Sequence, residues 1–149
     1  FLKSSKTEPL QFLDNLYKKY GYHEEKTENL YFEGAEGSET IKTLAASYRT
    51  SKLKEVSGIA VVKCKDFLDK GYIDEDEDEL SIENFLMLEL ENGFTIAIRP
   101  SGTEPKIKYY LFGCGEKNAL DLIESKKQVS LQMKEISEWL VEDANKRIG

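Results

Sequence analysis

The chain has 149 residues, of which 40% are apolar, so it can bury one core and a small appendage. Its net charge of −7 argues against a nucleic-acid or membrane-surface partner, because both present negatively charged surfaces. No apolar run approaches membrane-spanning length and no signal peptide is visible, so we expect a cytoplasmic protein. Because the chain begins at Phe1 without a methionine, we also expect it to be a piece of something longer.

The first third of the chain predicts a helix, a strand and a second helix. Leucines and tyrosines recur at helical spacing over residues 9–20, and Gly21 ends that helix. Residues 27–33 predict a short strand, after which Ser38 can cap the second helix. The apolar face of this second helix consists of Ile41, Leu44, Ala45 and Tyr48. Residues 50–57 are mixed polar and basic and predict a linker.

Strand-forming residues dominate after this linker. Gly58–Lys65 predicts a strand, and the segment that follows carries consecutive acidic residues over Asp74–Glu79. A calcium loop needs a glycine at its bend and spaced ligands, and neither is present, so we predict a solvated loop. Cys64 and Cys114 fall within strand-like segments and lack metal-ligand spacing, so we predict free, buried thiols.

Two neighbouring strands carry alternating apolar residues, and their register can be argued. The two apolar sets are Leu86, Leu88 and Leu90, then Phe94, Ile96 and Ile98. A two-residue Asn92-Gly93 turn would put these sets on opposite faces of the hairpin. A three-residue loop with Gly93 in the left-handed region instead pairs Leu90 with Phe94 and puts both sets on one face. We predict this second register, in which Arg99 lies on the face opposite the core.

The last strand and helix complete the predicted fold. Along residues 106–112, Ile107, Tyr109 and Leu111 face the core, and Lys108 shares the open face with Arg99. From residue 116 to about residue 147 the pattern predicts a helix that could break at 125–128. Its core stripe consists of Val129, Met133, Ile136, Leu140 and Ala144. We therefore predict an α+β fold: a four-stranded antiparallel sheet with helices on one face, preceded by a helix-strand-helix segment.

The turn between the last two strands, residues 99–105, concentrates groups that bind phosphate esters. The planar guanidinium of Arg99 can meet two phosphate oxygens at once, and Lys108 would add a point charge. Ser101 and Thr103 supply hydroxyl donors, and Gly102 lets the backbone approach a ligand. Two prolines stiffen the turn. This composition favours a phosphate grip over the alternative, a rigid β-turn with solvent-exposed cations.

Groups that would carry out a reaction are not evident in this turn. It has no base, no activated nucleophile and no metal-binding carboxylate in an obvious place. The single histidine, His23, follows a predicted helix end and is more typical of a surface residue. Glu104 could bond the backbone of the turn. By itself the chain therefore predicts a holder of phosphate.

The string RPSGTEPKIKYYL, residues 99–111, resembles the signature of the C-terminal domain of the α-D-phosphohexomutases, the phosphoglucomutase/phosphomannomutase family. The resemblance is strong over residues 84–112 and looser elsewhere. Residues 1–50 are similar to the end of that family's third domain, and residues 51–149 to its fourth, phosphate-binding domain. The fold that the resemblance implies is a TATA-binding-protein-like antiparallel sheet with helices on one face.

The resemblance also implies an activity. Such enzymes interconvert sugar 1-phosphate and sugar 6-phosphate through a phosphoserine and a sugar 1,6-bisphosphate, with Mg²⁺ as cofactor. The fourth domain would hold the non-reacting phosphate of a hexose phosphate through Arg99, Ser101, Gly102, Thr103 and Lys108. The expected partners are this substrate and the N-terminal domains of the same chain, with no nucleic acid and no membrane.

The chain departs from the family pattern where the chemistry is expected. The active-serine loop, the DGDxDR-type metal loop and the sugar-specificity loop are all absent, so we expect no turnover from this chain alone and place the Mg²⁺ ligands outside it. The KIKYYL continuation is more similar to phosphoglucomutases and phosphopentomutases than to phosphoglucosamine mutases. Phosphomannomutase and phosphopentomutase stay open as alternatives. So does a non-catalytic interaction module that uses the exposed sheet face.

Overall fold

The computed structural model describes residues 21–68, 84–116 and 121–149. In chain order these residues form β1 (His23–Tyr31), α2 (Gly37–Thr50), β2 (Glu55–Val56), β3 (Ile59–Asp66), β4 (Leu86–Leu90), β5 (Thr95–Pro100), β6 (Lys106–Cys114) and α3 (Leu122–Ile148). The helix predicted over residues 9–20 and the acidic segment 74–79 lie outside the described residues. None of the described helices is long and apolar enough to cross a membrane.

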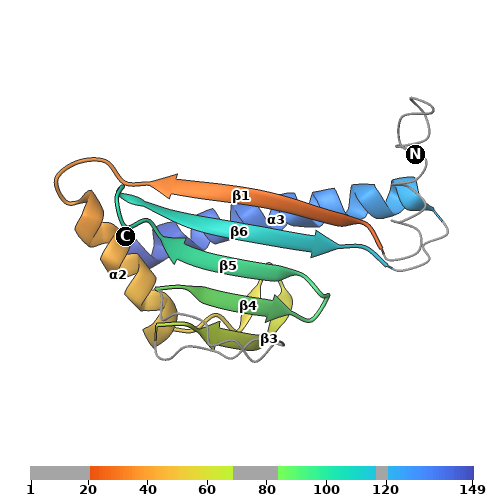
Figure 1. Cartoon of the computed structure of the whole chain (residues 1–149), viewed down its shortest axis with the longest axis horizontal. Helices are drawn as coiled ribbons and strands as arrows, with labels where there is room; N and C mark the ends of the chain where they lie inside the picture. The colour runs from red at the N-terminus through yellow and green to blue at the C-terminus, as the bar shows by residue number, and fades with distance from the viewer. Residues whose placement is uncertain (1–20, 69–83, 117–120) are drawn as a thin grey trace, which may run out of the picture.

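All six strands form one antiparallel sheet in the order β1-β6-β5-β4-β3-β2 (Figure 1). The helix α3 runs behind β1 and β6 in this view and contacts β1, β6 and β2. Since β1 and β2 are the two edges of the sheet, the sheet curls around α3. The helix α2 contacts β5, β6 and α3, so both helices share one face. Within the described part of the chain, the other face has no helix over it.

The predicted register of the β4–β5 hairpin is confirmed. The amide of Leu90 donates to the carbonyl oxygen of Phe94 at 2.8 Å, and Gly93 has a φ of 90°. Leu88 pairs with Ile96, and both apolar sets are buried. Arg99 is accordingly exposed near the end of β5, on the face without helices.

The faces predicted for β6 and α3 are also confirmed. Ile107, Tyr109 and Leu111 are buried, as are all five residues of the α3 core stripe. The helix begins after Asp121, whose carboxylate accepts a hydrogen bond from the amide of Glu124 at 3.0 Å. The break considered at residues 125–128 is wrong, because α3 is continuous through them.

The predicted fold class is wrong in its strand number and in its separate leading segment. The sheet has six strands rather than four, and β1 and α2 join its sheet and core instead of preceding it. The added strands are β1, which pairs with β6 along its whole length, and β2, which lies inside the predicted linker. The division of the chain at residue 50 into parts of two domains of a longer protein stays a prediction.

The strand predicted at residues 27–33 is the second half of β1, but the prediction assigns it to a separate leading segment, and it misses β2 altogether. Neither sequence alternates between apolar and polar residues, so neither pattern indicates a strand of this sheet. In β1, the core-facing side chains of Glu24 and Glu28 accept hydrogen bonds from the hydroxyls of Ser130 and Ser137, each at 2.7 Å. On this strand hydrogen bonds to α3 therefore add to the apolar contact that Leu30 makes with the core. In β2 a single apolar residue, Val56, is fully buried. Neither signal is visible without the tertiary structure.

Two smaller predictions also need correction. Ser38 does not cap α2, because the helix begins at Gly37 after Glu36 and its first turn has no side-chain cap. The cysteines are free, as predicted, but they are not buried: Cys64 is exposed and Cys114 is half-buried.

A pair of buried tyrosines joins α2 to the sheet. The hydroxyl oxygens of Tyr48 and Tyr109 lie 2.6 Å apart, and the two rings meet edge to face. Burial raises the pKa of Tyr48 to about 12 and also raises the pKa of Tyr109. Both hydroxyls therefore stay protonated at neutral pH, and each supplies the hydrogen-bond partner of the other.

Replacing Tyr109 by phenylalanine is expected to lower the free energy of unfolding by about 1–3 kcal/mol, because the buried hydroxyl of Tyr48 loses its partner. Tyr110→Phe is the matched control, since the neighbouring Tyr110 is only half-buried. Urea denaturation followed by circular dichroism measures both variants. Equal midpoints for the two variants would contradict an important role for the hydroxyl pair.

Candidate phosphate-binding site

Arg99 and Lys108 form a cross-strand pair on the open face of the sheet. The side chain of Arg99 is exposed and that of Lys108 is half-buried, and neither takes part in an ion pair among the described residues. Like charges opposite one another destabilise a strand pair. A bound anion between these two cations would remove that cost. The predicted placement of Lys108 beside Arg99 is thus confirmed, whereas the role of the pair stays a prediction.

The turn that follows Arg99 is closed by its own backbone. The amide of Ser101 donates to the carbonyl oxygen of Lys106 at 2.9 Å. The amide of Lys106 donates to the carbonyl oxygen of Glu104 at 2.8 Å. The hydroxyl oxygen of Ser101 accepts from the amides of Thr103 at 3.3 Å and Glu104 at 3.2 Å. Ser101 therefore shapes the turn, and its hydroxyl hydrogen is still able to point toward a ligand.

Lys106 differs from the other two cations of this region. Its Nζ lies 3.4 Å from Oε1 of Glu104 and 5.4 Å from the centroid of the Tyr31 ring. Desolvation acts to lower the pKa of Lys106, but the hydrogen bond to Tyr31 and the charge of Glu104 outweigh it, so the pKa is raised. The charge of Lys106 is therefore already balanced by the carboxylate of Glu104. Of these three cations, Arg99 and Lys108 are the two whose charge is left for a ligand.

The turn of residues 100–104 also faces the helix α2 across a pocket of about 450 Å³. The turn contributes residues 100–104, α2 contributes Ser38, Ile41 and Lys42 as the opposite wall, and Asn84, just before β4, also lines the pocket. The Nζ of Lys42 pairs with Glu39 at 3.2 Å, but both side chains are largely exposed, where such pairs are weak. Sequence analysis missed this wall, because only the packing of α2 against the turn brings it there.

The predicted site residues are therefore divided between two surfaces. Ser101, Gly102 and Thr103 line the pocket against α2, whereas Arg99 and Lys108 are not among its lining residues. The two surfaces adjoin at the turn, which connects the β5 strand that carries Arg99 to the β6 strand that carries Lys108. The amide of Phe32, in the connection between β1 and α2, donates to the carbonyl oxygen of Pro105 at 2.9 Å and fixes the turn to that connection.

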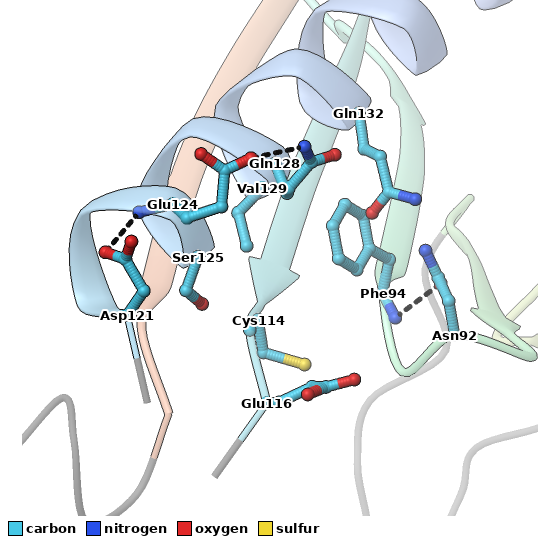
Figure 2. Close-up of a pocket in the computed structure, with 11 residues that line it drawn as sticks. Asn92, Phe94, Cys114, Glu116, Asp121, Glu124, Ser125, Gln128, Val129 and Gln132 are labelled. Carbon is cyan, nitrogen blue, oxygen red and sulfur yellow. Dashed lines mark hydrogen bonds between the residues drawn. The ribbon is translucent and has the colours of Figure 1, made fainter. Parts of the chain in front are cut away.

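A second pocket, of about 570 Å³, lies at the opposite end of the sheet (Figure 2). Its side chains include the carboxylates of Glu116, Asp121 and Glu124, and none of its described lining residues is a lysine or arginine. In Figure 2, Gln128 reaches Glu124, to whose carboxylate it donates at 2.9 Å. A phosphate dianion would be repelled here. The length of β6, about 27 Å at roughly 3.4 Å per residue, separates this pocket from the turn.

Metal-binding side chains do not gather in the described parts of the chain. No three His, Cys, Asp or Glu side chains there come close enough together to hold an ion. The Mg²⁺ that the family resemblance implies therefore finds no ligand set among these residues, and no step of the function proposed below passes through a metal that they hold.

The fold and the site define an α+β protein that presents a stiff, cationic turn at one end of an antiparallel sheet. No model of a known protein family matches the chain. Phosphoglucomutases of Staphylococcus aureus strains MRSA252 and N315 are each 34% identical to it over 104 residues, which cover 66% of this chain and 19% of theirs. The chain is thus a partial homologue of the phosphoglucomutases, which confirms the family predicted from residues 99–111.

The chain spans about a fifth of the length of these bacterial relatives. Among solved structures, it resembles the open form of pp63/parafusin from Paramecium, a protein described as a phosphoglucomutase. That likeness has a TM-score of 0.49 and 15% sequence identity, and it covers 94% of this chain and 23% of the Paramecium chain.

Proposed function

We propose that the chain is the C-terminal, substrate-phosphate-binding part of a phosphoglucomutase/phosphomannomutase-type enzyme. In this proposal Arg99 and Lys108 hold the phosphate of a hexose phosphate that is not being transferred. Ser101, Gly102 and Thr103 supply hydroxyl and backbone donors from the turn. Holding the remote end of the substrate orients the sugar for phosphoryl transfer elsewhere in the enzyme.

The observation that carries the proposal is the pair of adjacent cations without a carboxylate partner among the described residues. Arginine offers a fork that matches two phosphate oxygens, and lysine adds a compact charge. The third cation, Lys106, is neutralised by Glu104 within the turn. In a chain with a net charge of −7, this pair therefore provides a local site that attracts an anion.

The whole enzyme would interconvert sugar 1-phosphate and sugar 6-phosphate in the cytoplasm. The phosphoserine, the Mg²⁺ ligands and the groups that select the sugar would lie in N-terminal domains outside this chain, with sugar 1,6-bisphosphate as intermediate and activator. The chain alone would bind hexose phosphate weakly and would not turn it over. A phosphate site that serves both phosphoryl steps must accept either end of the bisphosphate, which a rigid turn on a mobile domain allows.

A titration followed by NMR tests the proposal on the purified chain. Glucose 1-phosphate, glucose 1,6-bisphosphate and inorganic phosphate should each shift the amide signals of residues 99–108, with glucose as the uncharged control. The signals of Cys114 and Glu116, at the acidic pocket, should not move.

Two outcomes would count against the proposal. Absence of shifts at millimolar phosphate ester would remove the assigned role of the turn. Shifts confined to the open face away from residues 99–108 would favour an interaction module instead. The exposed ring of Phe112 lies on that part of the face.

A further inference from the structure

An uncharged strip lies beside the two cations on the open face. Tyr110 follows Lys108 by two residues and Ala97 precedes Arg99 by two, and the register pairs Tyr110 with Ala97 and Ala97 with Met87. On the other side Tyr110 pairs with Thr27 of β1. This row lies about 7 Å along the strands from the Arg99–Lys108 row.

The burial of Ala97 indicates that this strip is compact. Ala97 is only 3% exposed, yet it is absent from the core cluster that joins the sheet to α2 and α3. Its neighbours in the row, Tyr110 and Met87, are themselves half-buried. Side chains on directly paired residues lie about 4.5–5.5 Å apart at their Cβ atoms, so Tyr110 and Met87 can close over the small methyl group between them. The result is an apolar floor next to the phosphate grip.

We propose that Tyr110, with Met87 beside it, is the surface on which the pyranose ring of a hexose phosphate rests. This inference depends on the proposed phosphate grip at Arg99 and Lys108. A pyranose ring has a face of C–H groups that packs on an aromatic ring, and the hydroxyl of Tyr110 can meet the polar edge of the sugar. The offset of about 7 Å between the two rows suits a phosphate in one and its sugar ring in the next.

The charge of the strip favours this occupant over a second phosphate. From Thr27 through Tyr110 and Ala97 to Met87 the row has no side chain that is charged at neutral pH. Beyond Met87 the row continues to Lys65, whose Nζ lies 3.9 Å from Oε1 of Glu89 and so has a carboxylate partner. A neutral, ring-shaped body attached to a phosphate therefore matches both rows. Tyr110 is accordingly a positioning residue for the sugar and contributes nothing to the affinity for phosphate itself.

The test compares two ligands on variants of the full chain. Tyr110→Ala should weaken glucose 1-phosphate binding by about three- to tenfold, while the affinity for inorganic phosphate stays unchanged. Tyr110→Phe should retain most of the affinity for both ligands. Phe112→Ala removes an aromatic ring from the same face one row further on, where 41% of the residue is exposed, and should leave both affinities unchanged.

The outcomes separate this inference from the proposed function. If Tyr110→Ala weakens inorganic phosphate as much as glucose 1-phosphate, or changes neither, the sugar-binding role is wrong while the phosphate grip stands. If the wild-type chain binds neither ligand at residues 99–108, the proposed function is wrong and this inference falls with it. Unchanged dispersion of the NMR spectrum shows that each variant is folded.

Discussion

Replacing Arg99 by lysine is expected to weaken the binding of glucose 1-phosphate by about 1–3 kcal/mol, the range for charge-assisted hydrogen bonds. The positive charge is retained, but the planar fork that meets two phosphate oxygens is lost. Arg99 is exposed at the end of β5 and takes part in no ion pair of the described residues, so its replacement should leave folding intact. Isothermal titration of the chain, or catalytic efficiency of the whole enzyme, measures the effect.

Two controls make this expectation specific. Lys108→Arg should keep or strengthen phosphate binding, because it adds a second fork at the partner position. Lys127→Met removes an exposed lysine from α3, on the other side of the sheet, and should have no effect at moderate salt. An unchanged affinity in Arg99→Lys, with both controls behaving as stated, would rule out a bidentate role for Arg99.

The second large effect is expected from Gly37→Ala at the start of α2. A Cβ atom at this position would collide with the carbonyl oxygen of Phe32 and would lie 3.1 Å from Cβ of Pro105. The backbone of Phe32 cannot yield easily, because its amide holds the carbonyl oxygen of Pro105 at 2.9 Å. We expect a loss of about 1–3 kcal/mol in the free energy of unfolding, the range for overpacking.

The same substitution should also weaken phosphate binding, because the displaced segment fixes the turn. Gly102→Ala is the matched control for stability: no atom lies within 4 Å of a Cβ placed there, so its unfolding midpoint should be almost unchanged. Urea denaturation of both variants, and a phosphate titration of Gly37→Ala beside the wild-type chain, distinguish the two effects. A Gly37→Ala protein as stable as wild type would mean that α2 and the turn are not packed as described.

Sequence patterns were sufficient where local geometry decides the structure. The alternation of Leu86–Leu90 and the glycine at position 93 define both the hairpin register and its open face, and hence the side on which Arg99 lies. Lys108 follows from the same period-two rule. The direction of these two side chains needs no tertiary information.

The remainder depends on contacts between segments that are distant in the sequence. The strand β1 is mostly polar on both faces, and its inward side chains are identified by the serines of α3 and by the packing of Leu30 against the core. Ser38 and Lys42 face the turn because Gly37 allows α2 to approach Pro105 closely. No spacing along the chain encodes such an approach, so the α2 wall of the candidate site could not be predicted.

The pairing of β1 with β6 has a kinetic consequence. It joins residues as distant as His23 and Cys114, and every other strand of the sheet lies between them in the sequence. Bringing together residues this far apart in the chain costs more conformational entropy than forming the β4–β5 hairpin, so this pairing is expected to form more slowly. We therefore expect β1 to be the last strand to dock, leaving β6 as a transient bare edge on which newly made chains are most exposed to misassembly.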